Sequence, residues 1–104
     1  MSVVMNFAMF PTDQGISVSA YVSKIVEMIS QSGFDYRLTA MGTIVETENV
    51  TQAFAIAEMA YDILEPHSKR VYATISLDIQ TNKPMGRITK KTESIEDKIG
   101  KLKT

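Results

Sequence analysis

Hydrophobic and polar residues alternate strictly over residues 70–80, "RVYATISLDIQ". A period of two predicts a strand with one buried face and one polar face. Residues 3–10, "VVMNFAMF", are apolar at almost every position and predict a second, more deeply buried strand. We expect this strand to end at Pro11, because proline cannot extend a hydrogen-bonded ladder.

Between these two strands, apolar residues recur at helical spacing in two segments. The first segment, residues 18–31, is expected to begin at Ser17 as N-cap and to stop before Gly33. Its apolar stripe consists of Val18, Val22, Ile25, Val26 and Ile29. This spacing predicts an amphipathic helix with one buried face.

The second helical segment follows Asn49, a typical N-cap residue, with Gln52 three positions later as in a weak capping box. We expect it to end before Pro66. Its predicted stripe is Val50, Ala53, Phe54, Ala57, Tyr61 and Leu64. Near the end of the chain, Ile95, Ile99 and Leu102 predict a short terminal helix capped around Ser94.

Residues 35–41 and 43–47 predict two strands that form a hairpin across Gly42. The predicted order is therefore β-α-β-β-α-β with a small helix at the end. Two amphipathic helices must bury their stripes against one sheet face. The sequence thus predicts an α+β, ferredoxin-like sandwich of one domain, residues 1–104, with a four-stranded antiparallel sheet and both helices on one side.

Composition excludes several classes of function. The chain has 11 basic and 12 acidic residues and a net charge of −1, which argues against a nucleic-acid surface. It has no cysteine and one histidine, His67, in a polar turn, so a metal site or a catalytic triad has little material. No signal peptide and no membrane span are predicted, so we expect a cytoplasmic protein with no membrane partner.

The sheet face opposite the helices is expected to be mixed in character. Its predicted members are Val4, Asn6, Ala8, Phe10, Arg37, Thr39, Met41, Ile44, Glu46, Tyr72, Thr74, Ser76 and Asp78. An exposed apolar patch of this kind usually marks an interface, so we expect this face to pack on a second subunit with two-fold symmetry. A ligand pocket between the layers would take its polar groups from Asn6, Glu46 and Asp78. The alternative is that Glu46 and Asp78 are ordinary solvated strand residues.

Several segments in sequence order resemble the YkoF-like family of small thiamine-binding proteins. These are "NFAMFP", the helix "SVSAYVSKIVEMISQSG", the hairpin "YRLTAMGTIVE", the strand "KRVYATISLDI" and the tail "KTESIEDKI". The hairpin is the most specific of them. The resemblance covers essentially the whole chain and implies a ferredoxin-like domain that forms dimers or tetramers through its sheet.

The resemblance also implies non-enzymatic binding of thiamine or its hydroxymethylpyrimidine part, with thiamine as ligand and no cofactor. Thr43 and Glu46 fall on the family's hairpin Thr and Glu, Asp78 on the aspartate of its last strand, and Asn6 on a polar position of its first strand. Met41 stands where several members have proline. The predicted ligand-contacting residues are Asn6, Met41, Thr43, Glu46, Tyr72 and Asp78.

The chemistry of thiamine is compatible with this set. A carboxylate offsets the thiazolium cation or accepts from the pyrimidine amino group, and Tyr72 or Phe10 offers a stacking face. The basic run "KPMGRITKK" is read as a solvated loop, so no basic cluster is expected at the site, which favours free thiamine over its pyrophosphate. Two alternatives remain: a structural or regulatory oligomer without ligand, and an enzyme that uses Glu46 and Asp78 as acid and base.

Overall fold

The computed structural model of the protein describes residues 1–15 and 18–103, so the predicted cap at Ser17 lies outside the described residues. Seven elements follow one another in the predicted order. They are β1 (Ser2–Pro11), α1 (Ser19–Gln31), β2 (Tyr36–Thr39), β3 (Gly42–Thr47), α2 (Val50–Leu64), β4 (Val71–Gln80) and α3 (Arg87–Ile99). Each predicted element is present.

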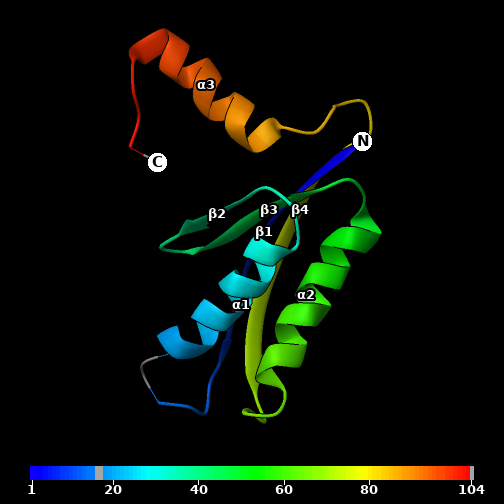
Figure 1. The fold of residues 1–104 in the computed structure, drawn as a ribbon, viewed down its shortest axis with the longest axis vertical. Helices are drawn as coiled ribbons and strands as arrows, with labels where there is room; N and C mark the ends of the chain where they lie inside the picture. The colour runs from blue at the N-terminus through cyan, green and yellow to red at the C-terminus, as the bar shows by residue number, and fades with distance from the viewer. Residues whose placement is uncertain (16–17, 104) are drawn as a thin grey trace.

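The four strands form one antiparallel sheet in the order β2-β3-β1-β4. The register pairs Val4 with Glu46 on one side and with Asp78 on the other. Directly paired residues share a face, so these three side chains lie together on the face opposite α1 and α2. Figure 1 shows α1 and α2 side by side over one face, with α3 standing apart near the start of β1. The protein therefore has the predicted ferredoxin-like fold.

The hydrophobic core lies between the sheet and the two helices α1 and α2. Met5 and Val45 contribute from the sheet and are fully buried, while Ile29 and Leu64 contribute from the helices and are also fully buried. Burying side chains of this size contributes about 1.5–3 kcal/mol each, relative to leaving them exposed. This layer accounts for the stability of the sandwich and confirms the predicted buried face of β1.

The stripe predicted for α2 is partly wrong. Ala53, Ala57 and Leu64 are buried as expected, but Phe54 and Tyr61 are 51% and 42% exposed. The buried face of α2 includes Ile56 and Ala60 in their place. These small alanines bring α2 close to the sheet and to α1. The larger Phe54 and Tyr61 lie at the border of this buried face. The spacing of apolar residues alone did not distinguish them from core residues.

The hairpin is shifted from its predicted position. Thr39 pairs with Gly42, so Ala40 and Met41 form the turn, and Gly42 is the first residue of β3. The Thr39 hydroxyl closes this turn, because its Oγ1 accepts from the Gly42 N–H at 3.1 Å and from the Met41 N–H at 3.2 Å. Glycine serves here for close packing: a Cβ at Gly42 would lie 2.9 Å from the Phe7 carbonyl oxygen.

The edge strand β4 is less covered than its alternation predicts. Ile75 and Ile79 point to the helix side, yet they are 41% and 45% exposed. Position explains this result, since β4 lies at the edge of the sheet and the two helices do not extend fully over it. No helix within residues 1–15 and 18–103 is long and apolar enough to span a membrane.

The terminal helix differs most from its prediction. It begins at Arg87, so Ser94 lies in its interior and is not its cap. Gly86, at the N-cap position, adopts a left-handed φ of 105° and has no capping side chain of its own. The donor groups at the start of α3 are satisfied by a residue 40 positions earlier, Glu46. A cap supplied by tertiary contact leaves no local sequence signal.

Candidate functional site

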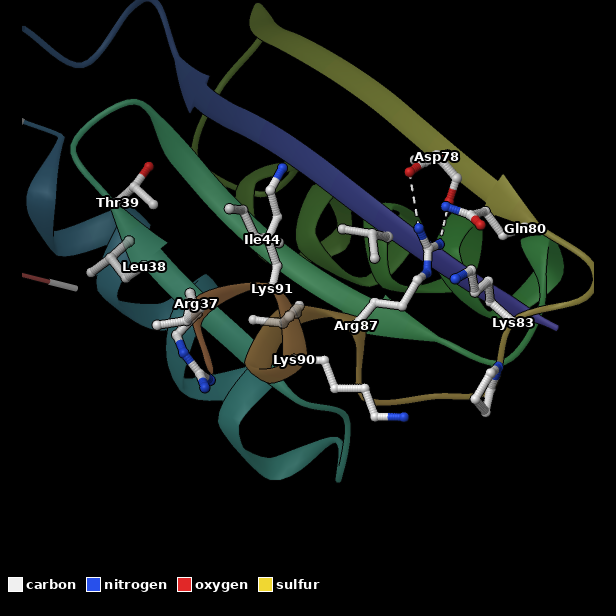
Figure 2. Close-up of a pocket in the computed structure, with 14 residues that line it drawn as sticks. Arg37, Leu38, Thr39, Ile44, Asp78, Gln80, Lys83, Arg87, Lys90 and Lys91 are labelled. Atoms are coloured by element: carbon white, nitrogen blue, oxygen red, sulfur yellow. Dashed lines mark hydrogen bonds and ion pairs between the residues drawn. The ribbon is translucent and has the colours of Figure 1, made fainter. Parts of the chain in front are cut away.

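A groove of about 790 Å³ lies between the open face of the sheet and α3 (Figure 2). Val4 and Ile44 contribute apolar surface from the sheet, and Ile88 contributes it from α3. Its other lining residues are Arg37, Leu38, Thr39, Asp78, Gln80, Lys83, Pro84, Arg87, Lys90, Lys91 and Thr92. The groove has the size and the mainly apolar base that small-molecule sites have, about 300–1,000 Å³.

Glu46 joins α3 to the sheet at one end of the groove. Its carboxylate accepts hydrogen bonds from the Gly86 N–H at 3.0 and 3.1 Å, from the Arg87 N–H at 3.2 Å and from the Ser2 hydroxyl. Although it lies on the open face, Glu46 is fully buried. A carboxylate is well placed at a helix N-terminus, where unpaired N–H groups and the helix dipole favour negative charge.

The ionisation of Glu46 follows from these contacts. Burial raises the pKa of its carboxyl, but the Ser2 hydroxyl and the Arg87 and Gly86 amides stabilise the charged form, and together they hold the pKa below its ordinary value. Glu46 is therefore an ionised structural anchor. Its acceptor oxygens face protein donors, and the residue does not line the groove.

Arg87 extends the same anchor to Asp78. Its guanidinium donates to Asp78 Oδ2 at 2.9 Å and to the Asp78 backbone oxygen at 2.8 Å. It also donates to Ser2 Oγ at 3.0 Å and to the Ser2 backbone oxygen at 2.8 Å. The Arg87 side chain is only 14% exposed, whereas that of Asp78 is 67% exposed. Asp78 thus binds Arg87 while still lining the groove, as Figure 2 shows.

A second, weaker anchor lies at the other end of α3's first turn. Arg37 of β2 pairs with Asp35 at 2.7 Å and donates to the Thr89 hydroxyl at 3.3 Å. The Thr89 hydroxyl in turn donates to Asp35 at 3.4 Å. These exposed contacts contribute little individually, since surface ion pairs provide about 0–1 kcal/mol. Together with the contacts of Glu46 and Arg87, they connect the first turn of α3 to the sheet.

The sequence-based prediction that no basic cluster lies at the site is wrong. Five cationic side chains line the groove: Arg37, Lys83, Arg87, Lys90 and Lys91. The run "KPMGRITKK" is the loop before α3 and the first turns of that helix, and α3 lies near the start of β1. The sequence contained this signal, but the position of α3 depends on the long-range contact with Glu46.

The structure separates the six residues predicted to contact a ligand. Glu46 and Asp78 are brought together through Arg87, and of the six only Asp78 lines the groove. Asn6 and Met41 lie beside a smaller hollow of about 120 Å³ on the same face. Thr43 pairs with Phe7 on the helix side of the sheet and is 5% exposed.

Tyr72 lies at the opposite end of β4 from Asp78. It packs against Phe10, with ring centroids 5.8 Å apart, and is 53% exposed. Six residues along a strand correspond to about 20 Å. Of these two residues, Asp78 lines the groove and Tyr72 does not. A ligand-contacting role for these residues stays a prediction, and Ser2, Arg87 and the groove lysines are the residues that sequence reasoning missed.

Known proteins resemble this chain over most of its length. A UPF0045 protein of Methanothermobacter thermautotrophicus is 31% identical over 84 residues, which is 80% of this chain and 84% of the relative. A UPF0045 protein of Mycobacterium bovis is 27% identical over 78 residues, 75% of this chain and 76% of the relative.

Two solved structures share the fold. A hypothetical protein of Methanocaldococcus jannascii matches with a TM-score of 0.79 at 25% identity, covering 92% of this chain and 97% of its own. A Thermotoga maritima protein, provisionally described as acting in thiamine biosynthesis or salvage, matches with a TM-score of 0.76 at 19% identity, covering 91% of this chain and 99% of its own. At 19% identity, the second likeness shows the fold alone.

The family model described as "Thiamine-binding protein" matches residues 5–96. This range includes α1, β2, β3, α2 and β4 in full, together with most of β1 and most of α3. The match spans most of the chain and agrees with the resemblance found in the sequence. The chain therefore belongs to the thiamine-binding protein family.

Proposed function

We propose that this protein binds thiamine or its hydroxymethylpyrimidine moiety in the groove between the open sheet face and α3, without catalysing a reaction. The observation that carries the proposal is the groove itself, with its volume of about 790 Å³ and its base formed by Val4 and Ile44. Family membership supports a thiamine-related ligand. The aminopyrimidine ring is a flat, partly apolar group that suits such a surface, with Asp78 and Gln80 able to meet its polar edge.

The contacts of the two carboxylates support binding more than acid–base catalysis. A pair of catalytic carboxyls needs environments that push their pKa values apart, with one group able to carry a proton at neutral pH. Glu46 is held ionised by the Ser2 hydroxyl and the α3 amides. Asp78 is paired with Arg87 at 2.9 Å. Glu46 therefore does not serve as a proton donor, and Asp78 already has an ion-pair partner.

We also propose that the protein functions as a homo-oligomer. In the monomer, Ile95 and Ile99 of α3 are 38% and 72% exposed, and α3 has no buried residue. Ile75 and Ile79 add exposed apolar surface on the edge strand β4. Exposed apolar side chains of this size are typical of interaction sites, and light scattering coupled to size-exclusion chromatography measures the resulting mass. A monomer at all concentrations would contradict this part of the proposal.

The experiment that tests binding is a thermal-shift titration with thiamine and hydroxymethylpyrimidine. A ligand that binds only the folded state stabilises it by about 2.7 kcal/mol at a concentration of 100 times Kd. The variant Ile44→Trp fills the base of the groove and should abolish the shift. Phe54→Trp, on the exposed face of α2, should retain it.

Two results would overturn the proposal. The first is no stabilisation by thiamine, by hydroxymethylpyrimidine or by their phosphate esters. The second is an equal shift in wild type and Ile44→Trp, provided that Ile44→Trp has a folded circular-dichroism spectrum, because binding would then occur outside the groove.

A further inference from the structure

The charges of the groove differ sharply from those of the whole chain. The protein has 11 basic and 12 acidic residues, a nearly even balance. The groove collects five of the basic residues and one carboxylate, Asp78. Clefts lined by one sign of charge focus the electrostatic potential and concentrate ions of the opposite sign. The groove is therefore electropositive on a protein that is slightly negative overall.

Two of the five cations have protein partners. Arg87 is engaged by Asp78 and Ser2 through four hydrogen bonds. Arg37 is paired with Asp35. Among the residues that the structure describes, no ion pair within 4.0 Å involves Lys83, Lys90 or Lys91. These three lysines come from the loop after β4 and from α3, and they carry the charge that is not balanced within the groove.

The commonest role of surface lysines is to remain solvated. A solvated helix face, however, does not require lysines from two segments and an arginine from a third element, β2, to line one cavity. Figure 2 shows Arg37 toward one end of the groove, Lys83 toward the other, and Lys90 and Lys91 between them on α3. Like charges gathered around one cavity repel each other, and a bound anion relieves that repulsion.

The only acidic lining residue is not available to balance a cationic ligand. Asp78 already pairs with Arg87, and Glu46 is buried beneath the start of α3. Free thiamine carries a permanent positive charge and would enter a groove in which the charges of Lys83, Lys90 and Lys91 are not balanced. A phosphate monoester carries about −1.5 to −2 charge at pH 7, which exceeds the single positive charge of the thiazolium. Phosphorylation therefore converts an unfavourable ligand charge into a favourable one.

We propose that the ligand of this groove carries a phosphate group, held by Lys83, Lys90 and Lys91. This inference rests on the proposed function and specifies its ligand class as a phosphate ester of thiamine or of hydroxymethylpyrimidine. The α3 N-terminus does not supply the anion site, because Glu46 occupies it. Recognition thus depends on lysine ammonium groups, which act as point charges and do not select a single phosphate geometry. Affinity should rise from the free alcohol to the monophosphate and again to the diphosphate.

Isothermal titration calorimetry tests this order with thiamine, thiamine monophosphate, thiamine diphosphate, the corresponding pyrimidine compounds and inorganic pyrophosphate. The double variant Lys90→Gln/Lys91→Gln should weaken binding of thiamine diphosphate about tenfold or more and leave or improve that of thiamine. The control Lys24→Gln/Lys69→Gln removes the same charge from exposed positions outside the groove and should leave both affinities unchanged. The preference for diphosphate should also fall between about 0.1 M and about 1 M salt, as the Debye length shortens from about 10 to about 3 Å.

The outcomes distinguish this inference from the function on which it rests. Binding of thiamine or the pyrimidine with no preference for phosphate esters overturns the inference and leaves the proposed function intact. Equal losses in the groove variant and the control variant also overturn it, since the effect is then one of net charge. If inorganic pyrophosphate binds and none of the thiamine or pyrimidine compounds does, both proposals are overturned.

Discussion

The two faces of the same four-stranded sheet are built in different ways. On the helix-covered face, Met5, Phe7 and Val45 are at most 3% exposed and form part of the core. On the open face, the neighbouring residues Asn6 and Ser76 are exposed. This face is joined to α3 by polar contacts, such as the hydrogen bond between Glu46 and the Gly86 N–H. Packing thus stabilises one face, while the other face is free to hold a charged groove.

The largest change in the free energy of unfolding should come from a substitution in the core. Leu64 of α2 is fully buried in the core cluster. Leu64→Ala should lower the free energy of unfolding by about 2–5 kcal/mol, because the lost contacts leave a cavity. Ser76→Ala on the open face should change it by less than about 0.5 kcal/mol. Urea denaturation measures both, and a Ser76→Ala loss equal to that of Leu64→Ala would contradict the division between the faces.

The next effect concerns the anchor of α3. Glu46→Gln replaces an acceptor-only carboxylate with an amide whose NH₂ group faces the Gly86 and Arg87 amides and the Ser2 hydroxyl. The expected loss is about 1–3 kcal/mol, the cost of a buried polar group left without its partner. The loss should be local, so amide exchange should accelerate in α3 and much less in α1 and α2.

The matched control for this anchor is Glu93→Gln, an exposed position on α3. It removes the same charge from the same helix and should leave exchange in α3 unchanged. Faster exchange of α3 in both variants would assign the effect to net charge and not to the Glu46 contact.

The same comparison explains how far the sequence was informative. A nearly continuous apolar run predicted β1, a period of two predicted β4, and helical spacing predicted α1 and α2, because burial leaves its pattern in the local sequence. The start of α3 and the groove were missed for the opposite reason. Gly86 is capped by Glu46, and Arg87 contacts Ser2 across 85 residues. The sequence predicted that Glu46 lies in a ligand pocket, whereas the contacts of its carboxylate in the structure are a helix end and a hydroxyl of the same chain.

A pH dependence of intermediate size follows from Glu46. Its pKa in the folded protein lies below the ordinary value because the Ser2 hydroxyl and the backbone amides at the start of α3 outweigh the effect of burial. The stabilisation is therefore complete above the unfolded-state pKa, about 4.3, and is lost as the pH falls through the lower folded-state pKa. Denaturation profiles should show wild type and Glu46→Gln converging on acidification. A difference between them that stays constant down to about pH 3 would contradict the assignment.

The smallest effect compares a helix start encoded locally with the one built by Glu46. Asn49 caps α2 through its Oδ1, which accepts from the Gln52 N–H at 2.8 Å, while the Gln52 side chain accepts from the Glu48 N–H at 2.8 Å. Asn49→Ala should cost about 1 kcal/mol, and Asn49→Asp, which keeps the acceptor, should cost much less. Since α2 is part of the core layer, this loss should lower the global Tm, by roughly 4–8 °C in a domain of this size. The contrary result would be faster amide exchange only within the first turn of α2, with Tm unchanged. That result would show that this end of α2 unfolds independently and that the helix layer is less cooperative than its packing indicates.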